Sequence, residues 1–177
     1  DAQDRQVIFH GVNVVYKIPP YIPDEKNFDA QTSLTEEDID NLAKWGLNQV
    51  RLGVMWEAVE TAPGVYNEAY LKEIDALITK LGEKGISTLV DAHQDVLTRM
   101  ICGEGMPEFY AKDIVAKGTY CIDPTLDWLA SPLYKALGFC KAIKDYHYRS
   151  DADGNPVIAD CQKTPFLSFY SSPESFT

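Results

Sequence analysis

The sequence predicts an α/β chain that forms the N-terminal part of a (β/α)8 TIM barrel. Its first 95 residues alternate in the order β-α-β-α-β, with connections of the length that places parallel strands side by side. Three such strands can also begin an open, doubly wound sheet, but no G-x-G-x-x-G motif follows the first strand. Polar side chains fall at or just beyond the carboxyl ends of all three strands, and in barrels that end carries the active site. We therefore predict the barrel.

The first strand and first helix are predicted from composition and capping signals. Residues 7–17 are dominated by β-branched and aromatic side chains without strict alternation, as in a strand buried on both faces. Three prolines make residues 18–31 a loop. A helix follows, capped by Ser33 or Thr35 and ended at Gly46.

The next elements repeat this alternation. Residues 47–55 form a second apolar run and are predicted as a strand. After a turn at residues 63–64, Asn67 caps a second helix, in which apolar residues recur at helical spacing up to Gly85. The third strand is predicted at residues 86–90. These elements complete the two crossovers expected at the start of a barrel.

Beyond residue 96, glycines and prolines interrupt every long periodic segment. Short helices are predicted around residues 107–112 and 125–140. A loop region of this length inside a compact domain is usually functional. No internal repeat or linker divides the chain, so residues 1–177 are predicted to be a single partial barrel domain. In it, residues 1–95 carry the strands and residues 96–177 form a loop-rich insertion that leads toward the next helix.

Charge and hydropathy exclude two classes of partner. The chain carries 16 Lys plus Arg against 27 Asp plus Glu, for a formal net charge of -11, and no basic run interrupts this balance. Nucleic acid is therefore a poor candidate, because binding a polyanion requires a cationic face. No segment approaches the roughly 20 apolar residues that span a bilayer, so we expect no transmembrane segment.

The cysteines indicate an oxidising compartment. Cys102, Cys121, Cys140 and Cys161 are even in number and include no C-x-x-C pair, which argues against a zinc knuckle or a thioredoxin-like site. Two disulfides favour a secreted or lysosome-like protein, whereas four reduced, buried thiols are the alternative. Of the three possible connectivities we predict the sequential one, Cys102 with Cys121 and Cys140 with Cys161.

Five polar residues at the strand ends are candidate site residues. Lys17 either lies at the barrel rim or contacts substrate, and Arg51 within its apolar strand needs either an ion pair or a function. His93 and Asp95 are two residues apart, so on an extended backbone they face the same side. They either bind a substrate hydroxyl or form a buried pair. We predict that Lys17, His93 and Asp95 line one pocket, supported by Arg51 and Asn13.

Other kinds of chemistry lack their sequence signals. No H-E-x-x-H motif indicates a metal site, and no G-x-S-x-G motif indicates a serine nucleophile. Disulfide formation would remove the cysteines as nucleophiles. We therefore expect neither a metal nor a cofactor.

Several short runs resemble the endoglycoceramidase branch of glycoside hydrolase family 5. They are His10–Lys17, Val50–Glu57, Pro63–Asn67, Asp91–Asp95 and Cys102–Gly105. The resemblance covers the first 110 residues in order and implies hydrolysis of the linkage between oligosaccharide and ceramide, with retention of configuration. It also implies substrate contacts at Lys17, His93 and Asp95, and places Arg51 at the arginine that supports the nucleophile.

The sequence departs from the family at its catalytic glutamates, which the resemblance puts after the fourth strand, in an Asn-Glu pair, and after the seventh. The one Asn-Glu pair here, Asn67-Glu68, begins a helix and is interpreted as a cap. We expect no catalytic residue in this chain, and expect the C-terminal remainder of a processed precursor to complete the barrel as a second chain. Activity as an endoglycosidase would then require both chains.

Two other functions stay open at this level. One is a catalytically inactive, glycosidase-like domain that acts as a glycan-binding or structural extracellular protein. The other is a different sugar substrate within the same family, because later loops build most of the pocket around the aglycone. Substrate-binding residues would look alike in all three cases.

Overall fold

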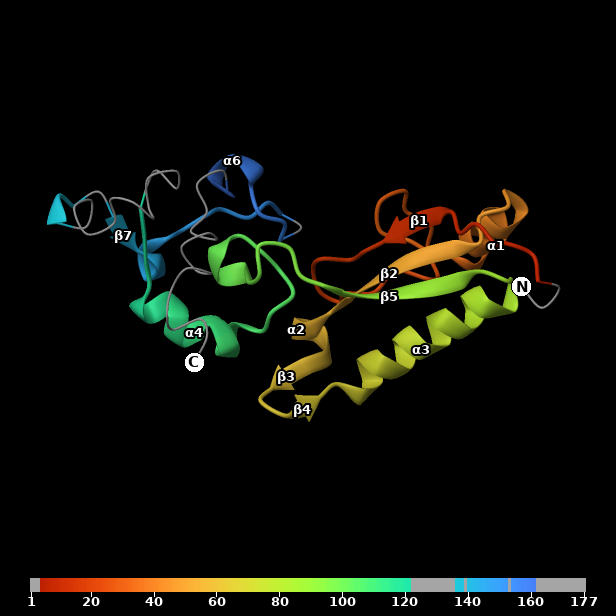
Figure 1. Ribbon diagram of the computed structural model, residues 1–177, viewed down its shortest axis with the longest axis horizontal. Coiled ribbons are helices and arrows are strands. Elements are labelled where there is room, and N and C mark those ends of the chain that lie inside the picture. The colour runs from red at the N-terminus through yellow and green to blue at the C-terminus, as the bar shows by residue number, and fades with distance from the viewer. Residues whose placement is uncertain (1–3, 122–135, 139, 153, 162–177) are drawn as a thin grey trace. The chain divides into compact units, whose positions relative to one another are not determined.

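The computed structural model describes residues 4–121, 136–138, 140–152 and 154–161 (Figure 1). The chain divides into two compact units, of which the first comprises Asp1–Val59 with Tyr66–His93. The second comprises Glu60–Val65 with Gln94–Thr177. The first unit contains the predicted strand-and-helix alternation, and the second contains the loop-rich region.

The first unit is built on a three-stranded sheet in the order β1-β2-β5, with β1 at Gly11–Val14, β2 at Gln49–Met55 and β5 at Ser87–His93. Both pairs of strands are parallel. The prediction of three parallel strands is therefore confirmed. The first strand is shorter than predicted, and β5 extends to His93 rather than ending near residue 90.

Helices α1 (Glu36–Lys44) and α3 (Glu68–Glu83) provide the two crossovers. The Asn67 side chain caps α3, as the sequence predicts. Of the two candidates for the cap of α1, Ser33 and Thr35, the structure selects Thr35, whose side chain forms a capping box with Asp38. Gly46 follows α1 at a φ of +79°, a left-handed conformation that glycine adopts without steric cost. Within the part of the chain that the structure describes, no helix is long and apolar enough to cross a lipid bilayer.

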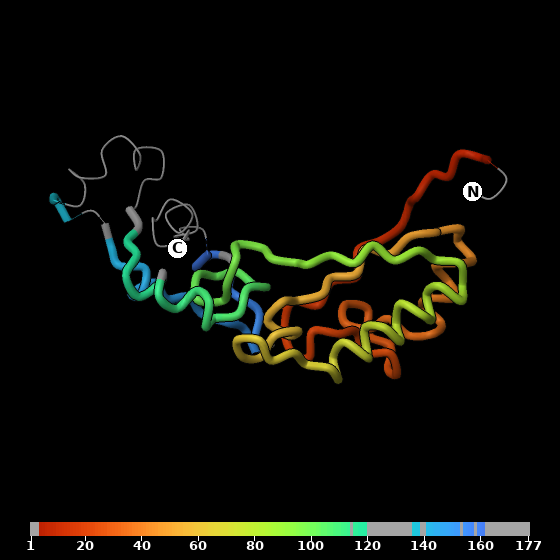
Figure 2. Tube along the Cα trace, turned by 60° about the horizontal axis from the view of Figure 1, so that its bottom comes forward, coloured from red at the N-terminus to blue at the C-terminus, as the bar shows by residue number. Residues whose placement is uncertain are grey.

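One apolar core joins the helices to the sheet in this unit. Val50 and Leu52 project from the same face of β2 and are 0% and 1% exposed, so that face is buried along the first part of the strand. The helices contribute side chains at helical spacing to the same cluster: Ile39, Leu42, Tyr70, Ile74, Leu77 and Leu81. Figure 2 shows α3 running alongside β5. Each fully buried aliphatic side chain contributes about 1.5–3 kcal/mol, which makes this cluster the main stabilising element of the unit.

Three short elements follow β2 that the sequence did not predict. Helix α2 spans Trp56–Val59, and the strands β3 (Glu60–Ala62) and β4 (Val65–Tyr66) pair around the predicted turn. Glu60 is only 5% exposed and accepts hydrogen bonds from the Gly64 amide and the Tyr110 hydroxyl, both at 2.7 Å. All three residues belong to the second unit, and within it these bonds connect the turn to the chain segment that contains Tyr110.

The second unit combines short helices with an antiparallel hairpin. Its elements are η1 (Arg99–Ile101), α4 (Glu108–Lys117), β6 (Thr119–Cys121), β7 (Cys140–Ala142), η2 (Ile143–Asp145) and α6 (Ile158–Cys161). A small apolar cluster forms around Leu97, Ile101, Ala111, Val115 and Ile143. Helix α4 is longer than predicted. The helix predicted at residues 125–140 lies largely outside the described residues, and Cys140 begins a strand instead.

The predicted sequential disulfides are wrong. Cys102 is bonded to Cys161, 59 residues further along the chain, with 5.7 Å between the two Cα atoms. The register of β6 and β7 places the backbone of Cys121 directly opposite that of Cys140. Closeness along the chain misled the prediction, because the chain turns back through this hairpin and α6 returns to the end of η1.

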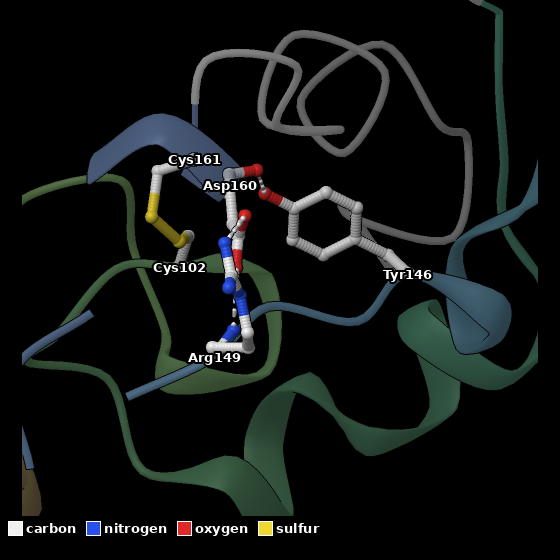
Figure 3. Close-up of polar contacts among 5 residues, drawn as sticks. All are labelled: Cys102, Tyr146, Arg149, Asp160 and Cys161. Atoms are coloured by element: carbon white, nitrogen blue, oxygen red, sulfur yellow. Dashed lines mark hydrogen bonds and ion pairs between the residues drawn. A yellow bond between two sulfur atoms is a disulfide. The ribbon is translucent and has the colours of Figure 1, made fainter. Parts of the chain in front are cut away.

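Polar contacts surround the disulfide (Figure 3). The Arg149 side chain donates two hydrogen bonds to the Asp160 carboxylate, at 2.8 and 3.0 Å, and the Arg149 amide donates a third at 3.0 Å. The Tyr146 hydroxyl donates to the Asp160 carbonyl at 3.1 Å. The hydrogen bonds from the Arg149 side chain and amide lower the pKa of Asp160 to about 2. Asp160 thus links α6 to the chain segment that follows η2.

Candidate active site

The candidate site lies at the carboxyl ends of two neighbouring parallel strands. The register pairs Gly53 of β2 with Asp91 of β5, and Met55 with His93. Arg51 precedes Gly53 by two residues, so it projects from the same face of the sheet as Asp91 and His93. The pairing of β2 with β5 therefore brings three polar side chains together.

One carboxylate oxygen connects these side chains. Asp91 Oδ2 lies 2.8 Å from Arg51 Nη2 and 2.7 Å from His93 Nδ1. The three side chains are 39%, 20% and 8% exposed in the order Arg51, Asp91 and His93, so the imidazole is the most enclosed. The sequence required either an ion pair or a function for Arg51, and the structure provides the ion pair.

Asp91 belongs to this bonded set, and the sequence analysis did not name it as a candidate. The alternation argument joined His93 to Asp95, but β5 ends at His93 and the extended backbone does not continue to residue 95. The same argument applied backward along the strand selects Asp91, two residues before His93. The sequence could have indicated Asp91 only if the end of β5 had been placed at His93, and the sequence analysis placed it three residues earlier, at residue 90.

The other three predicted site residues are Asn13, Lys17 and Asp95. Asn13 lies in β1, in register with Arg51, and is exposed. Lys17 is exposed and lies three residues beyond the end of β1. Asp95 is exposed and belongs to the second unit. A single pocket lined by Lys17, His93 and Asp95 stays a prediction.

Tyr16, the neighbour of Lys17, remains a neutral phenol. Burial, followed by the nearby carboxylates of Asp29, Asp38 and Asp24, raises its pKa to about 12. At neutral pH its hydroxyl therefore keeps its proton. It can donate a hydrogen bond but cannot act as a phenolate nucleophile.

The loop after β5 has a tightly constrained backbone. Val96 and Leu97 both adopt positive φ values, of 53° and 74°, which are rare for branched side chains. The Glu104 amide donates to the Asp95 carbonyl at 2.9 Å, and the Met106 amide donates to the Leu97 carbonyl at 2.8 Å. These bonds close the loop and fix the backbone from which the Asp95 side chain projects. Such strain persists where surrounding contacts hold it, and it concentrates at functional sites.

Comparison with known proteins assigns the chain to a family. The model of the cellulase family, glycosyl hydrolase family 5, matches residues 2–123. An endoglycoceramidase of Cyanea nozakii is 43% identical over 109 residues, which are 62% of this chain and 22% of that protein. An endoglycoceramidase of Hydra vulgaris is 33% identical over 170 residues, which are 96% of this chain and 29% of that protein.

Solved structures support the same assignment. Endo-glycoceramidase II from Rhodococcus sp., in a five-membered iminocyclitol complex, matches with a TM-score of 0.53 and 30% identity over 70% of this chain and 27% of that one. A structure of that enzyme described as a lactosyl-enzyme intermediate matches with a TM-score of 0.52 and 28% identity, over 70% of this chain and 28% of that one.

The matches confirm the fold class, since the parallel β1-β2-β5 sheet with its crossover helices is the N-terminal part of a (β/α)8 barrel. The chain spans between 22% and 29% of the length of the two curated relatives. Because the family model covers well over half of the chain, the chain belongs to glycosyl hydrolase family 5, and within that family it is similar to the endoglycoceramidases.

Proposed function

We propose that the protein containing this chain is a retaining glycoside hydrolase that cleaves the linkage between oligosaccharide and ceramide in glycosphingolipids. The observation that carries the proposal is the hydrogen-bonded set of Arg51, Asp91 and His93 at the carboxyl ends of parallel strands in a member of family 5. The two relatives named as endoglycoceramidases support the substrate class. The lactosyl-enzyme intermediate of the Rhodococcus enzyme supports retention, because retaining hydrolysis proceeds through a covalent glycosyl-enzyme.

In this proposal the chain supplies part of the substrate site. Lys17, His93 and Asp95 bind sugar hydroxyls, and Arg51 and Asn13 support the site from β2 and β1. The two catalytic carboxylates come from residues outside this sequence, at a separation of about 5 Å that suits retention. Asn67 is engaged as the N-cap of α3, which supports the interpretation of the Asn67-Glu68 pair as a helix cap.

The same proposal includes a compartment and a partner. The disulfide between Cys102 and Cys161 supports a secreted or lysosome-like location, since such bonds persist in oxidising compartments. The partner is the C-terminal remainder of the same precursor, separated by proteolytic processing and retained as a second chain. An acidic optimum is expected, because one carboxyl group must be protonated as the general acid while the other is ionised.

The test is hydrolysis of lactosylceramide in detergent micelles by the natural protein that contains this chain. We expect release of lactose and ceramide, with the β-anomer of lactose formed first, as followed by chromatography and NMR. Lys17→Ala and His93→Ala should lower kcat/KM. Lys44→Ala should leave kcat/KM unchanged, because Lys44 is exposed in the last turn of α1, away from the strand ends.

The alternatives give different results in this assay. Binding of the glycolipid without any release of sugar would reject the hydrolase and favour the glycan-binding protein. Hydrolysis of a simple aryl glycoside, with none of the glycosphingolipid, would keep the hydrolase and reject the ceramide-linked substrate. First appearance of the α-anomer would reject retention.

A further inference from the structure

Asp91 joins two donors from two strands at a single oxygen. Its Oδ2 is 2.8 Å from Arg51 Nη2 and 2.7 Å from His93 Nδ1. A guanidinium group has donors only, so Asp91 Oδ2 acts as an acceptor toward Arg51. An acceptor at hydrogen-bond distance from His93 Nδ1 requires the hydrogen to lie on that ring nitrogen.

The position of this hydrogen determines what the imidazole can bind. In a neutral imidazole one nitrogen donates and the other accepts, so a hydrogen on Nδ1 makes Nε2 an acceptor. The His93 side chain is only 8% exposed, so water competes little for the bond to Asp91. A sugar hydroxyl can donate to Nε2 of such a ring.

We propose that Asp91 is a positioning residue that holds His93 in the Nδ1–H tautomer, so that Nε2 accepts a hydrogen bond from a substrate hydroxyl. The inference rests on the proposed function for the identity of the ligand as a sugar. Arg51 is the second part of the arrangement, because its bond to Asp91 Oδ2 orients the carboxylate from the neighbouring strand. The direction of the His93 ring is thereby tied to the pairing of β2 with β5.

The hydrogen on His93 is measured directly by 15N NMR of the imidazole nitrogens in the natural protein that contains this chain, with the His93 signals assigned by their loss in His93→Gln. At pH 8 we expect a protonated Nδ1 and an unprotonated Nε2. Asp91→Ala removes the acceptor and should shift the ring toward the Nε2–H tautomer. Asp91→Asn should shift it less, because the two donors share one oxygen and an amide oxygen can accept both.

Kinetics give the second measurement, with lactosylceramide as the substrate. Asp91→Ala should lower kcat/KM by about 100-fold, the loss expected when a group that contacts substrate is misplaced by about 1 Å. Asp91→Asn should recover much of this loss. Asp75→Asn is the matched control, because Asp75 is exposed on α3, and it should change neither the tautomer nor kcat/KM.

The outcomes separate this inference from the proposed function. A wild-type protein with the hydrogen on Nε2 overturns the role of Asp91, whether or not the variants fold. An unchanged tautomer in a folded Asp91→Ala variant also overturns it. If the wild-type protein shows the Nδ1–H tautomer and Asp91→Ala shifts it, while no glycosphingolipid is cleaved, the positioning role is supported and the proposed function fails.

Discussion

Gly103 occupies a position in the loop after β5 where a side chain does not fit. A Cβ atom built there would lie 2.4 Å from the Val96 carbonyl oxygen and 2.5 Å from the Asp95 carbonyl oxygen. Both neighbours are backbone atoms, so relief requires the loop itself to move. The same loop carries the left-handed residues Val96 and Leu97, and it has little freedom to adjust.

We therefore expect Gly103→Ala to lower the free energy of unfolding by about 1–3 kcal/mol, as overpacking of a tight site does. Urea denaturation measures this change. Gly82→Ala is the control, because Gly82 lies in α3 with nothing within 4 Å of the added Cβ, and it should stabilise the protein by about 0.5–1 kcal/mol. Equal stability of Gly103→Ala and the wild type would reject the close approach of the backbone.

At the same scale, the bonds between Asp160 and Arg149 make the stability of the folded protein depend on pH. The hydrogen bonds from Arg149 lower its pKa from 3.8 to about 2 in the folded protein. The unfolded chain therefore binds this proton at a higher pH than the folded protein does. The contribution of Asp160 to stability is fully present above a pH of about 4 and is lost as the pH falls through about 2.

Asp160→Asn should lower the melting temperature at pH 7, and the difference from the wild type should shrink between pH 4 and pH 2. Thermal unfolding followed across this range measures the effect. Asp113→Asn, at an exposed position on α4, is the matched substitution and should show no such convergence. A difference that is constant with pH would contradict the ion pair with Arg149.

At the scale of elements, the disulfide connects two short helices that lie far apart in the sequence. It joins Cys102, directly after η1, to Cys161, the last residue of α6. Helices of three and four residues are too short to be stable by themselves. The Tyr148 hydroxyl also donates to the Arg99 carbonyl, which connects η1 to the segment between η2 and α6.

Replacement of Cys102 and Cys161 by serine should destabilise the protein by on the order of 4 kcal/mol, because the bond closes a loop of about 60 residues in the unfolded chain. Chemical denaturation of the double variant measures the loss. Peptide mapping under non-reducing conditions should give a linked pair of peptides that contain these two cysteines. A peptide linking Cys102 to Cys121 would contradict the structure.

At the scale of the whole molecule, the sheet of the first unit leaves apolar side chains exposed at its margins. Leu89 and Val90 of β5 are 50% and 55% exposed, and Val12 of β1 is 38% exposed. Leu89 and Val90 are consecutive, so they project from opposite faces of the strand. An edge strand whose two faces carry exposed apolar side chains tends to pair with another chain. The barrel fold of the family provides neighbours for both edges.

Residues 1–177 produced alone should therefore aggregate and unfold without cooperativity, because an unclosed barrel buries too little apolar surface to offset the chain entropy. The natural protein that contains these residues should be monodisperse and unfold cooperatively. Size-exclusion chromatography and urea denaturation compare the two samples. A monodisperse, cooperatively folded sample of residues 1–177 would contradict this expectation.

The sequence by itself determined the features that depend on neighbouring residues. The apolar spacing of α3, its cap Asn67 and the parallel arrangement of the strands were all predicted correctly. The cap of α1, Thr35, was one of two candidates that the sequence left open. Each follows from a local pattern, since a cap and its partner are three residues apart and apolar alternation is read within one strand. Arg51 and His93 were selected as candidates on a similar basis, because strand ends can be located approximately from the sequence.

Only the tertiary structure decided the contacts between distant residues. The bond of Asp91 to Arg51 joins positions 40 residues apart, and it depends on the register of β2 with β5 and on the true end of β5 at His93. The disulfide partner of Cys102 depends on a hairpin that turns the chain back before α6. Sequence patterns fix what each segment prefers, but which segments meet is set by the packing of the whole chain, because that packing decides which polar groups are close enough to bond.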